Sequence, residues 1–165
     1  MAPLFTQIFI YNLGLSDYSK MANKVEMFVR LVIPDTTAIT AFHAIERMGY
    51  RAGKLQRYDY YSFSFTGDIE KFKEQISNVD VLVNANKHRH SFEIEDKESA
   101  KVLVKDIDNG AKGILSTLNN RLGFKNIVSM EKGTLWLMDT DEKTAREIAE
   151  KLLYNKHYQK AEIYR

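Results

Sequence analysis

The sequence predicts an α+β fold made of two tandem ferredoxin-like repeats, each of the strand-helix-strand-strand-helix-strand (βαββαβ) type. The pentapeptide RMGYR (Arg47–Arg51) returns 74 residues later as RLGFK (Arg121–Lys125), matched in residue type at every position. The tripeptide Asn86-Lys87-His88 returns 69 residues later as Asn155-Lys156-His157. Strand-like and helix-like segments follow the same order in both halves, and such self-similarity indicates an internal duplication. We expect the two antiparallel sheets to form a pseudo-dimer within one chain.

The first repeat is predicted at residues 24–95. Residues 25–33 (VEMFVRLVI) alternate between apolar and polar, as a half-buried strand does. Pro34, Asp35 and Thr36 then offer a stop and helix-capping side chains. Residues 38–48 carry an apolar stripe at helical spacing, and Gly49 follows where a helix-terminating glycine is expected.

The remainder of this repeat contains a strand or hairpin, a helix and a closing strand. Residues 55–65 (LQRYDYYSFSF) alternate and are rich in aromatic residues, which is typical of a strand. Asp68 is predicted to open a second helix, because apolar residues follow it at helical spacing. The run HSFEI (90–94) is predicted as the closing strand.

A charged stretch, EDKESA (95–100), separates the halves, and residues 96–99 are predicted as the linker. The second repeat, 100–165, then follows the same order of elements. Its predicted elements are a strand at 101–106, a helix at 110–124, strands at 126–130 and 134–138 around a Glu131-Lys132-Gly133 turn, a helix at 140–153 and a closing strand at 161–164. At the 74-residue offset, Tyr61 and Phe63 correspond to Leu135 and Leu137, which we expect on the same strand face.

Apolar residues on the inner faces of these elements form the predicted core. They are Val29, Leu31, Ile45, Met48, Phe63, Phe72, Val102, Val104, Leu118, Leu122, Leu137, Ile148 and Leu152. Residues 1–23, with the strand-like run TQIFIYNL, form an N-terminal extension outside both repeats.

Composition narrows the possible functions. The 165 residues include 24 basic and 22 acidic side chains, so net charge gives no indication of nucleic-acid or membrane binding. The absence of cysteine excludes disulfides, thiolate metal sites and cysteine nucleophiles. The N-terminus lacks the basic region and cleavage pattern of a signal peptide, and no apolar run approaches the ~18 residues of a membrane span. We therefore expect a cytoplasmic protein.

The sequence does not predict a catalytic, metal or cofactor site. His88 and His90 could share a strand face, but no third ligand lies nearby, so they are interpreted as part of a polar turn. His43 is interpreted as a surface or interface residue of a helix. Asp139, Asp141 and Glu142 cluster at a predicted helix start, where capping and the helix dipole explain them. No phosphate-binding glycine loop, nucleophile elbow or HExxH motif occurs.

Residues 33–65 and 108–138 resemble the small S subunit of phosphoribosylformylglycinamidine synthase, an amidotransferase of purine biosynthesis. The resemblance lies in an acidic or glycine turn, an alanine- and leucine-bearing helix that ends near Met/Leu-Gly-Tyr/Phe, and the apolar strand that follows. The family also has a Val-Arg-x-Gly-Lys hairpin, to which Arg57 corresponds in the first copy and Gly133 in the second. Glu131 stands at the arginine position of the second copy, and Asp59-Tyr60 replaces the Gly-Lys pair of the first.

The resemblance implies a non-catalytic subunit that bridges a glutaminase subunit and a large ATP-dependent synthetase subunit. Family members associate through their sheets, which a tandem duplication would reproduce within one chain. The residues expected to contact the partner subunits are those of the hairpins: Arg57, Tyr60, Lys132 and Thr134.

Two other functions remain open at this stage. The same element order occurs in RNA-recognition modules, which stack bases on exposed aromatic residues of a central strand. The strand from Leu55 to Phe65 mixes basic and aromatic residues as such a strand would, although the second copy has only Trp136 there. An ACT-like domain that binds a small regulatory ligand at its pseudo-dimer interface is the other alternative.

Overall fold

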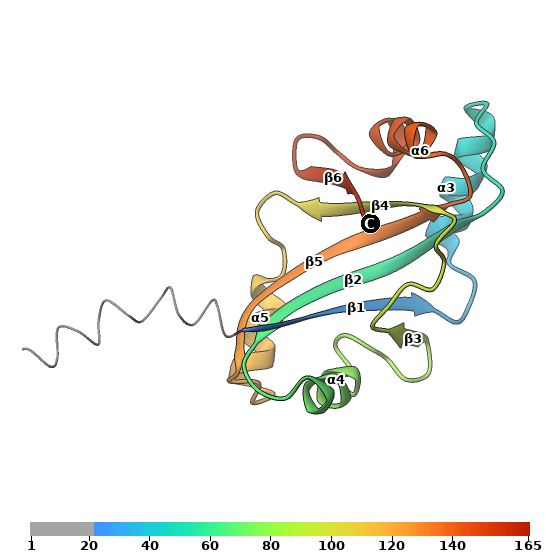
Figure 1. Ribbon diagram of the computed structural model, residues 1–165. Helices are drawn as coiled ribbons and strands as arrows, with labels where there is room; N and C mark the ends of the chain where they lie inside the picture. Colours follow the sequence, from blue (N-terminus) through green and yellow to red (C-terminus); the bar gives the residue numbers. More distant parts are fainter. Residues whose placement is uncertain (1–21) are drawn as a thin grey trace, which may run out of the picture.

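Six strands form one antiparallel sheet in the order β3-β1-β2-β5-β4-β6 (Figure 1). The computed structural model describes residues 22–165, so the predicted strand-like run TQIFIYNL lies outside the described residues. The strands are β1 (Asn23–Leu31), β2 (Leu55–Phe65), β3 (His88–Ser91), β4 (Ala100–Asp106), β5 (Ile127–Met138) and β6 (Gln159–Ile163). The chain is therefore α+β, with a single sheet in place of the two that the sequence predicts.

Four α-helices connect these strands. They are α3 (Thr36–Arg47), α4 (Ile69–Ser77), α5 (Lys112–Asn120) and α6 (Glu142–Ile148), which continues as a π-helical segment, η1 (Ala149–Leu153). The side chains of Asp35, Asp68 and Asp141 accept hydrogen bonds from backbone N–H groups in the first turns of α3, α4 and α6. The predicted caps are thus confirmed. None of these helices is long and apolar enough to span a membrane.

The two pentapeptides end helices as predicted. Gly49 and Gly123 adopt positive φ angles of 84° and 79°, a conformation that costs glycine little. The following aromatic residues, Tyr50 and Phe124, return to pack against the hydrophobic core.

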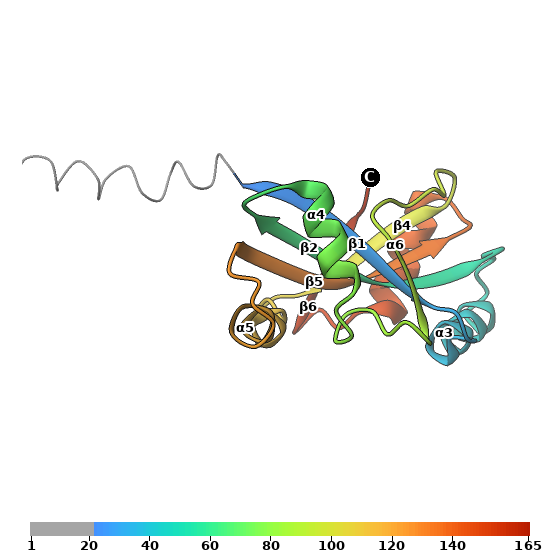
Figure 2. The ribbon, with the colours of Figure 1, turned by 90° about the horizontal axis from the view of Figure 1, so that it is seen from below.

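Two hydrophobic clusters lie under the helices. Figures 1 and 2 show α4 and α5 towards one end of the sheet and α3 and α6 towards the other. In the first cluster, α4 and α5 cover Met27, Phe63 and neighbouring strand residues. In the second cluster, α3 and α6 cover Val102, Trp136 and neighbouring strand residues. Each cluster contains residues of both 24–95 and 100–165, so the two predicted repeats share their cores. The division into repeats itself stays a prediction.

The predicted hairpin around Glu131, Lys132 and Gly133 is wrong, because β5 runs through these residues without a turn. They pair with Ser62, Tyr61 and Tyr60 of β2 along a ladder that covers the whole of β2. A Cβ atom on Gly133 would lie 2.5 Å from the Val104 carbonyl oxygen. Glycine is therefore needed here because β4 approaches closely, and not because the chain turns at this position.

The 74-residue correspondence within these strands is also wrong by one position. Tyr61 and Phe63 face the helices, whereas Leu135 and Leu137 belong to a cluster on the other face of the sheet. Trp136 and Met138 are the β5 residues that face the helices. Side chains alternate along a strand, so an offset of one residue exchanges the two faces.

Most predicted core residues are buried, but two are exposed and two are half-buried. Met48 and Leu122 are 41% and 49% exposed. Met48 directly follows α3, and Leu122 lies two residues after the end of α5. The chain leaves the helical path at these points, so the helical periodicity no longer places the side chains inward. Leu31 and Leu152 are half-buried. The closing strand β3 begins at His88, two residues before the predicted start, and residues 92–94 lie beyond it.

Candidate interaction surfaces

The four predicted contact residues lie in the central β2–β5 ladder and not on exposed hairpins. Arg57 pairs with Trp136, Tyr60 with Gly133, Lys132 with Tyr61, and Thr134 with Asp59. Three of them are half-buried on the helix-bearing face, whereas Tyr60 is 2% exposed and belongs to the cluster on the opposite face. The expectation that these residues lie in hairpins is therefore wrong, while a contact role for them stays a prediction.

Arg57, Asp59, Lys132 and Thr134 form a polar strip on the helix-bearing face, between the two hydrophobic clusters. We call it the central strip. Arg57 Nε donates a hydrogen bond to Asp35 Oδ2 at 2.8 Å, which ties β2 to the loop before α3. Burial raises the pKa of Asp59, and the Arg57 guanidinium only partly offsets this effect. The strip thus has two cationic side chains around a carboxylate whose ionised form is disfavoured by burial. This arrangement suits polar contacts with a partner protein.

Tyr60 takes part in a contact that joins β1 and β2 to Tyr164 near the C-terminus, which we call the C-terminal clasp. The hydroxyls of Tyr60 and Tyr164 both donate to the Glu26 carboxylate, each at 2.6 Å. Phe28 completes the aromatic group, with its ring centroid 5.7 Å from that of Tyr60 and 5.8 Å from that of Tyr164. Sequence reasoning missed the clasp because Tyr60 and Tyr164 lie 34 and 138 residues from Glu26 in the sequence.

The pKa values of the clasp follow from this geometry. Burial alone would raise the pKa of Glu26, but the hydrogen bonds from Tyr164 and Tyr60 and the nearby Lys24 outweigh it and lower the pKa. Burial and the Glu26 carboxylate raise the pKa of both tyrosines above their ordinary value. The clasp therefore holds an ionised carboxylate and two neutral phenols at neutral pH.

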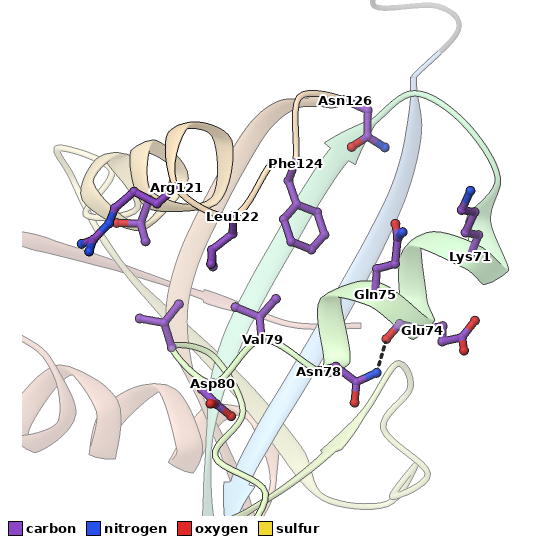
Figure 3. A pocket seen from close by; sticks show the side chains of 13 residues that line it. Lys71, Glu74, Gln75, Asn78, Val79, Asp80, Arg121, Leu122, Phe124 and Asn126 are labelled. Carbon is purple, nitrogen blue, oxygen red and sulfur yellow. Dashed lines mark hydrogen bonds between the residues drawn. The ribbon is translucent and has the colours of Figure 1, made fainter.

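A groove of about 990 Å³ lies between α4 and α5 (Figure 3). In Figure 3 the side chains of Val79 and Phe124 point towards one another in this groove, and Leu122 lies beside them. Leu122 is 49% and Val81 is 55% exposed, so apolar surface remains accessible. The lining residues are Lys71, Glu74, Gln75, Asn78, Val79, Asp80, Val81, Thr117, Arg121, Leu122, Gly123, Phe124 and Asn126.

The groove could not be found from the sequence, because Leu122 has the spacing of a core residue. Only the end of α5 at Asn120 shows that Leu122 leaves the helical stripe. The second copy of the pentapeptide therefore supplies surface residues that the repeat pattern assigns to the core.

The predicted polar turn at His88 and His90 is wrong, because both residues belong to β3, whereas Asp141 has the capping role that the sequence suggested. His88 Nδ1, at the start of β3, accepts a hydrogen bond from the Asn84 backbone N–H at 3.1 Å. Asp141 caps α6 through the Thr144 backbone N–H at 2.9 Å. Within residues 22–165, no group of three or more His, Asp or Glu side chains is placed to hold a metal ion.

Known proteins give no further guidance on these surfaces. No family model matches the chain, and no curated protein sequence matches it either.

Proposed function

We propose that the chain is a non-catalytic assembly subunit of phosphoribosylformylglycinamidine synthase, which links the glutaminase and ATP-dependent synthetase subunits. The β2–β5 ladder is the observation that carries the proposal. Residues 23–91 and 100–163 have the same strand-helix-strand-helix-strand order, and the ladder joins them edge to edge in one sheet. This is the arrangement that two S-subunit-like repeats, associated through their sheets, would adopt within one chain.

Local details of the two halves support a tandem repeat. Both second helices begin at an aspartate cap, Asp68 and Asp141. Before each edge strand an asparagine, Asn84 or Asn155, accepts a backbone N–H in its side chain and donates its own backbone N–H to a side chain four residues later. The same turn chemistry in the same place favours duplication over chance. The shared cores favour a pseudo-dimer over two separate domains.

A bridging subunit needs two distinct contact surfaces, and the described residues offer two that have no residue in common. The α4–α5 groove exposes apolar side chains, which favour burial against a partner. The central strip presents Lys132, which favours contacts with acidic groups, beside Arg57, which Asp35 already pairs at 2.8 Å. We assign one partner subunit to each surface.

Copurification tests the proposal. The tagged full chain, mixed with extract of its own cells in the presence of glutamine and a nucleotide, should retain both the glutaminase and the synthetase subunit, identified by mass spectrometry. Leu122→Asp should remove one subunit and Arg57→Glu with Lys132→Glu the other. Met48→Asp is the matched control, because Met48 follows the end of α3 as Leu122 follows the end of α5 and is similarly exposed.

Two results of the copurification would contradict the proposal in whole or in part. If neither subunit is retained by a chain that is folded by circular dichroism, the proposal is wrong. If both are retained by the Arg57→Glu/Lys132→Glu variant, the central strip is not a contact surface.

The RNA-binding alternative is weakened by the position of its aromatic residues. Tyr60 and Tyr61 are 2% and 9% exposed, so their rings do not offer the free faces on which bases stack. A labelled single strand that bound the chain in a salt-dependent manner would restore this alternative.

A further inference from the structure

Two pairs of basic residues face each other across the outer strands of the sheet. Arg30 of β1 pairs with Arg89 of β3, and Lys105 of β4 pairs with Lys160 of β6. Both pairs lie on the face opposite the helices, because Arg30 and Lys105 each follow by two residues a member of the cluster on that face, Phe28 or Leu103. Like charges directly opposite in a ladder destabilise it, so each pair calls for neutralisation.

The second pair is neutralised within the chain. Lys105 Nζ lies 3.3 Å from Glu131 Oε2 and 3.0 Å from Glu162 Oε1. The Lys105 side chain is only 17% exposed, so these carboxylates act where solvent screening is reduced. Two negative charges thus accompany the two positive charges of Lys105 and Lys160.

The first pair has no such partners. Among residues 22–165, no acidic oxygen lies within 4.0 Å of the side chain of Arg30 or Arg89. Glu162 pairs with Leu103, two residues before Lys105, and Ser91 pairs with Phe28, two residues before Arg30. Serine therefore stands where the second half has a carboxylate.

The other carboxylate is also replaced. Glu131 lies two residues before Gly133, the β5 partner of Lys105. The β1–β2 register, with Val29 opposite Asp59, places Tyr58 opposite Arg30, and Gln56 lies two residues before Tyr58. Glutamine thus stands where the second half has Glu131. The first half keeps the cation pair and lacks both anions.

The space next to the arginines is a cavity of about 370 Å³, lined by Arg30, Arg89, Gln56, Ser91 and Tyr58. Lys54, Phe28, His90, Glu93, Ile94, Glu95 and Asp96 complete its lining. Asp96 is already bound by Lys54, at 3.5 Å, and by Ser99, whose hydroxyl donates to it at 2.8 Å. The two guanidinium groups and the Gln56 amide are donors that suit an oxyanion, whereas the Ser91 hydroxyl already donates to the Glu93 backbone carbonyl at 2.8 Å.

We propose that Arg30 and Arg89 form a binding site for a small dianion, carried as a phosphate group or as a dicarboxylate. The charge follows from the second half, where two carboxylates balance the corresponding cation pair. A phosphomonoester carries about −1.5 to −2 charges at pH 7 and offers several acceptor oxygens, so it supplies the missing charge in one group. Arginine forks bind phosphate and carboxylate through two parallel hydrogen bonds.

Calorimetric titration of the full chain at constant ionic strength tests the site, with inorganic phosphate and succinate as probes and acetate as the monoanionic control. We expect one saturable site that binds a dianion more tightly than acetate. Whether phosphate or succinate binds more tightly shows whether the natural ligand carries a phosphate group or two carboxylates. Arg30→Gln with Arg89→Gln should weaken binding at least tenfold, the equivalent of about 1.4 kcal/mol. Lys160→Gln, in the matching pair of the other half, should leave the affinity unchanged.

Exchanging the acidic residues between the halves gives a second test, in which anion binding should be lost in the first half or gained in the second. Gln56→Glu with Ser91→Glu should abolish binding, because the new carboxylates occupy the arginines. Glu131→Gln with Glu162→Ser should create a second site and double the stoichiometry. Circular dichroism verifies that each variant is folded. No saturable binding of either dianion, equal affinity for acetate, or unchanged affinity in the arginine variant would each overturn the proposal.

Discussion

At one end of the sheet the helices are tied together by polar contacts, and at the other end they are not. The Tyr50 hydroxyl donates to Glu147 Oε2 at 3.3 Å, and Lys151 Nζ lies 5.1 Å from the centroid of the Tyr50 ring. These contacts join the end of α3 to α6 and η1. Within residues 22–165, no side-chain hydrogen bond or ion pair joins α4 to α5, and the 990 Å³ groove lies between them.

The difference is explained largely by two residues of the second pentapeptide and its neighbouring helix. Phe124 stands where the first pentapeptide has Tyr50, and it lacks the hydroxyl that anchors the other end. Counting from the caps Asp68 and Asp141, Asn78 stands where η1 has Lys151. Similar helix packing therefore yields a closed surface at one end and an accessible apolar groove at the other, which suggests that the two ends serve different purposes.

The largest expected effect on stability comes from a substitution in a hydrophobic cluster. It tests whether the two ends of the sheet unfold together or independently. Phe72→Ala removes a ring that is 1% exposed and stacked on Phe65 at 3.7 Å, so it should cost about 3–5 kcal/mol of unfolding free energy. Because both clusters draw on both halves, we expect the whole sheet to unfold in one transition. Urea unfolding followed by far-UV circular dichroism and by Trp136 fluorescence measures this.

Trp136 is the only tryptophan and lies in the α3–α6 cluster, far from the mutated ring. Coincident transitions by the two probes would establish cooperativity. A Trp136 transition that stays at the wild-type position, while the dichroism shifts, would mean that the ends unfold separately. Ile148→Ala, in the α3–α6 cluster, is the matched variant and should cost about 2–5 kcal/mol.

The C-terminal clasp is expected to stabilise both ends together, because it joins β1 and β2 to the last residues of the chain. Glu26→Gln should cost about 2 kcal/mol, since hydrogen bonds to a charged group contribute more than neutral ones. The pKa of Glu26 is lower in the folded chain than its ordinary value of 4.5, so its contribution is present above that value and is lost as pH falls through the folded pKa. Chemical denaturation at pH 7 and in steps below pH 4.5 measures both.

The variant and wild type should converge in stability at the acidic end of that series. Glu70→Gln is the control, because Glu70 is 82% exposed and its surface ion pair with Lys73 contributes little. A difference between wild type and Glu26→Gln that is independent of pH would show that the charge of Glu26 is not what stabilises the clasp.

Much of this architecture could be predicted from local sequence signals. Caps such as Asp68 and helix stops such as Gly123 depend on the chemistry of neighbouring residues, and these predictions are confirmed. Strand pairing depends on residues far apart, so the continuous β5 and the face occupied by Leu135 could not be derived from local patterns. Gly133 illustrates the problem, because a turn and a close approach of strands both favour glycine.

The candidate sites were predicted less well than the fold, for the same reason. Arg57 is recognisable as a polar residue in a strand, whereas Lys132 was predicted in a turn. Their position between two hydrophobic clusters follows only from the β2–β5 register. The C-terminal clasp and the Arg30–Arg89 pair each require strands that are distant in sequence. The groove required knowledge of where α5 ends.

Removing the hydroxyl of Tyr50 tests how far the polar contacts keep the α3–α6 end closed. Tyr50→Phe should lower Tm by less than about 3 °C, because the lost contacts lie at the surface. Hydrogen exchange should nevertheless increase in α6 and η1 and remain unchanged in α4. If hydrogen exchange in α6 and η1 is the same in Tyr50→Phe as in wild type, packing alone closes this end. Tyr154→Phe, which removes a half-buried tyrosine hydroxyl that makes no hydrogen bond within residues 22–165, is the control.

The smallest effect on stability is expected from transferring these contacts to the other end. Asn78→Lys with Phe124→Tyr recreates the residue types of Lys151 and Tyr50 beside Glu74, which stands where α6 has Glu147. Surface substitutions usually change stability by at most about 0.5 kcal/mol, although Asn78 also donates to the Glu74 carbonyl at 2.8 Å and that bond is lost. The expected consequence is a narrower groove and loss of the partner subunit that depends on Leu122. The double variant is compared with wild type and with each single variant. If all four retain this partner to the same extent, the contrast between the two ends is structural and has no role in assembly.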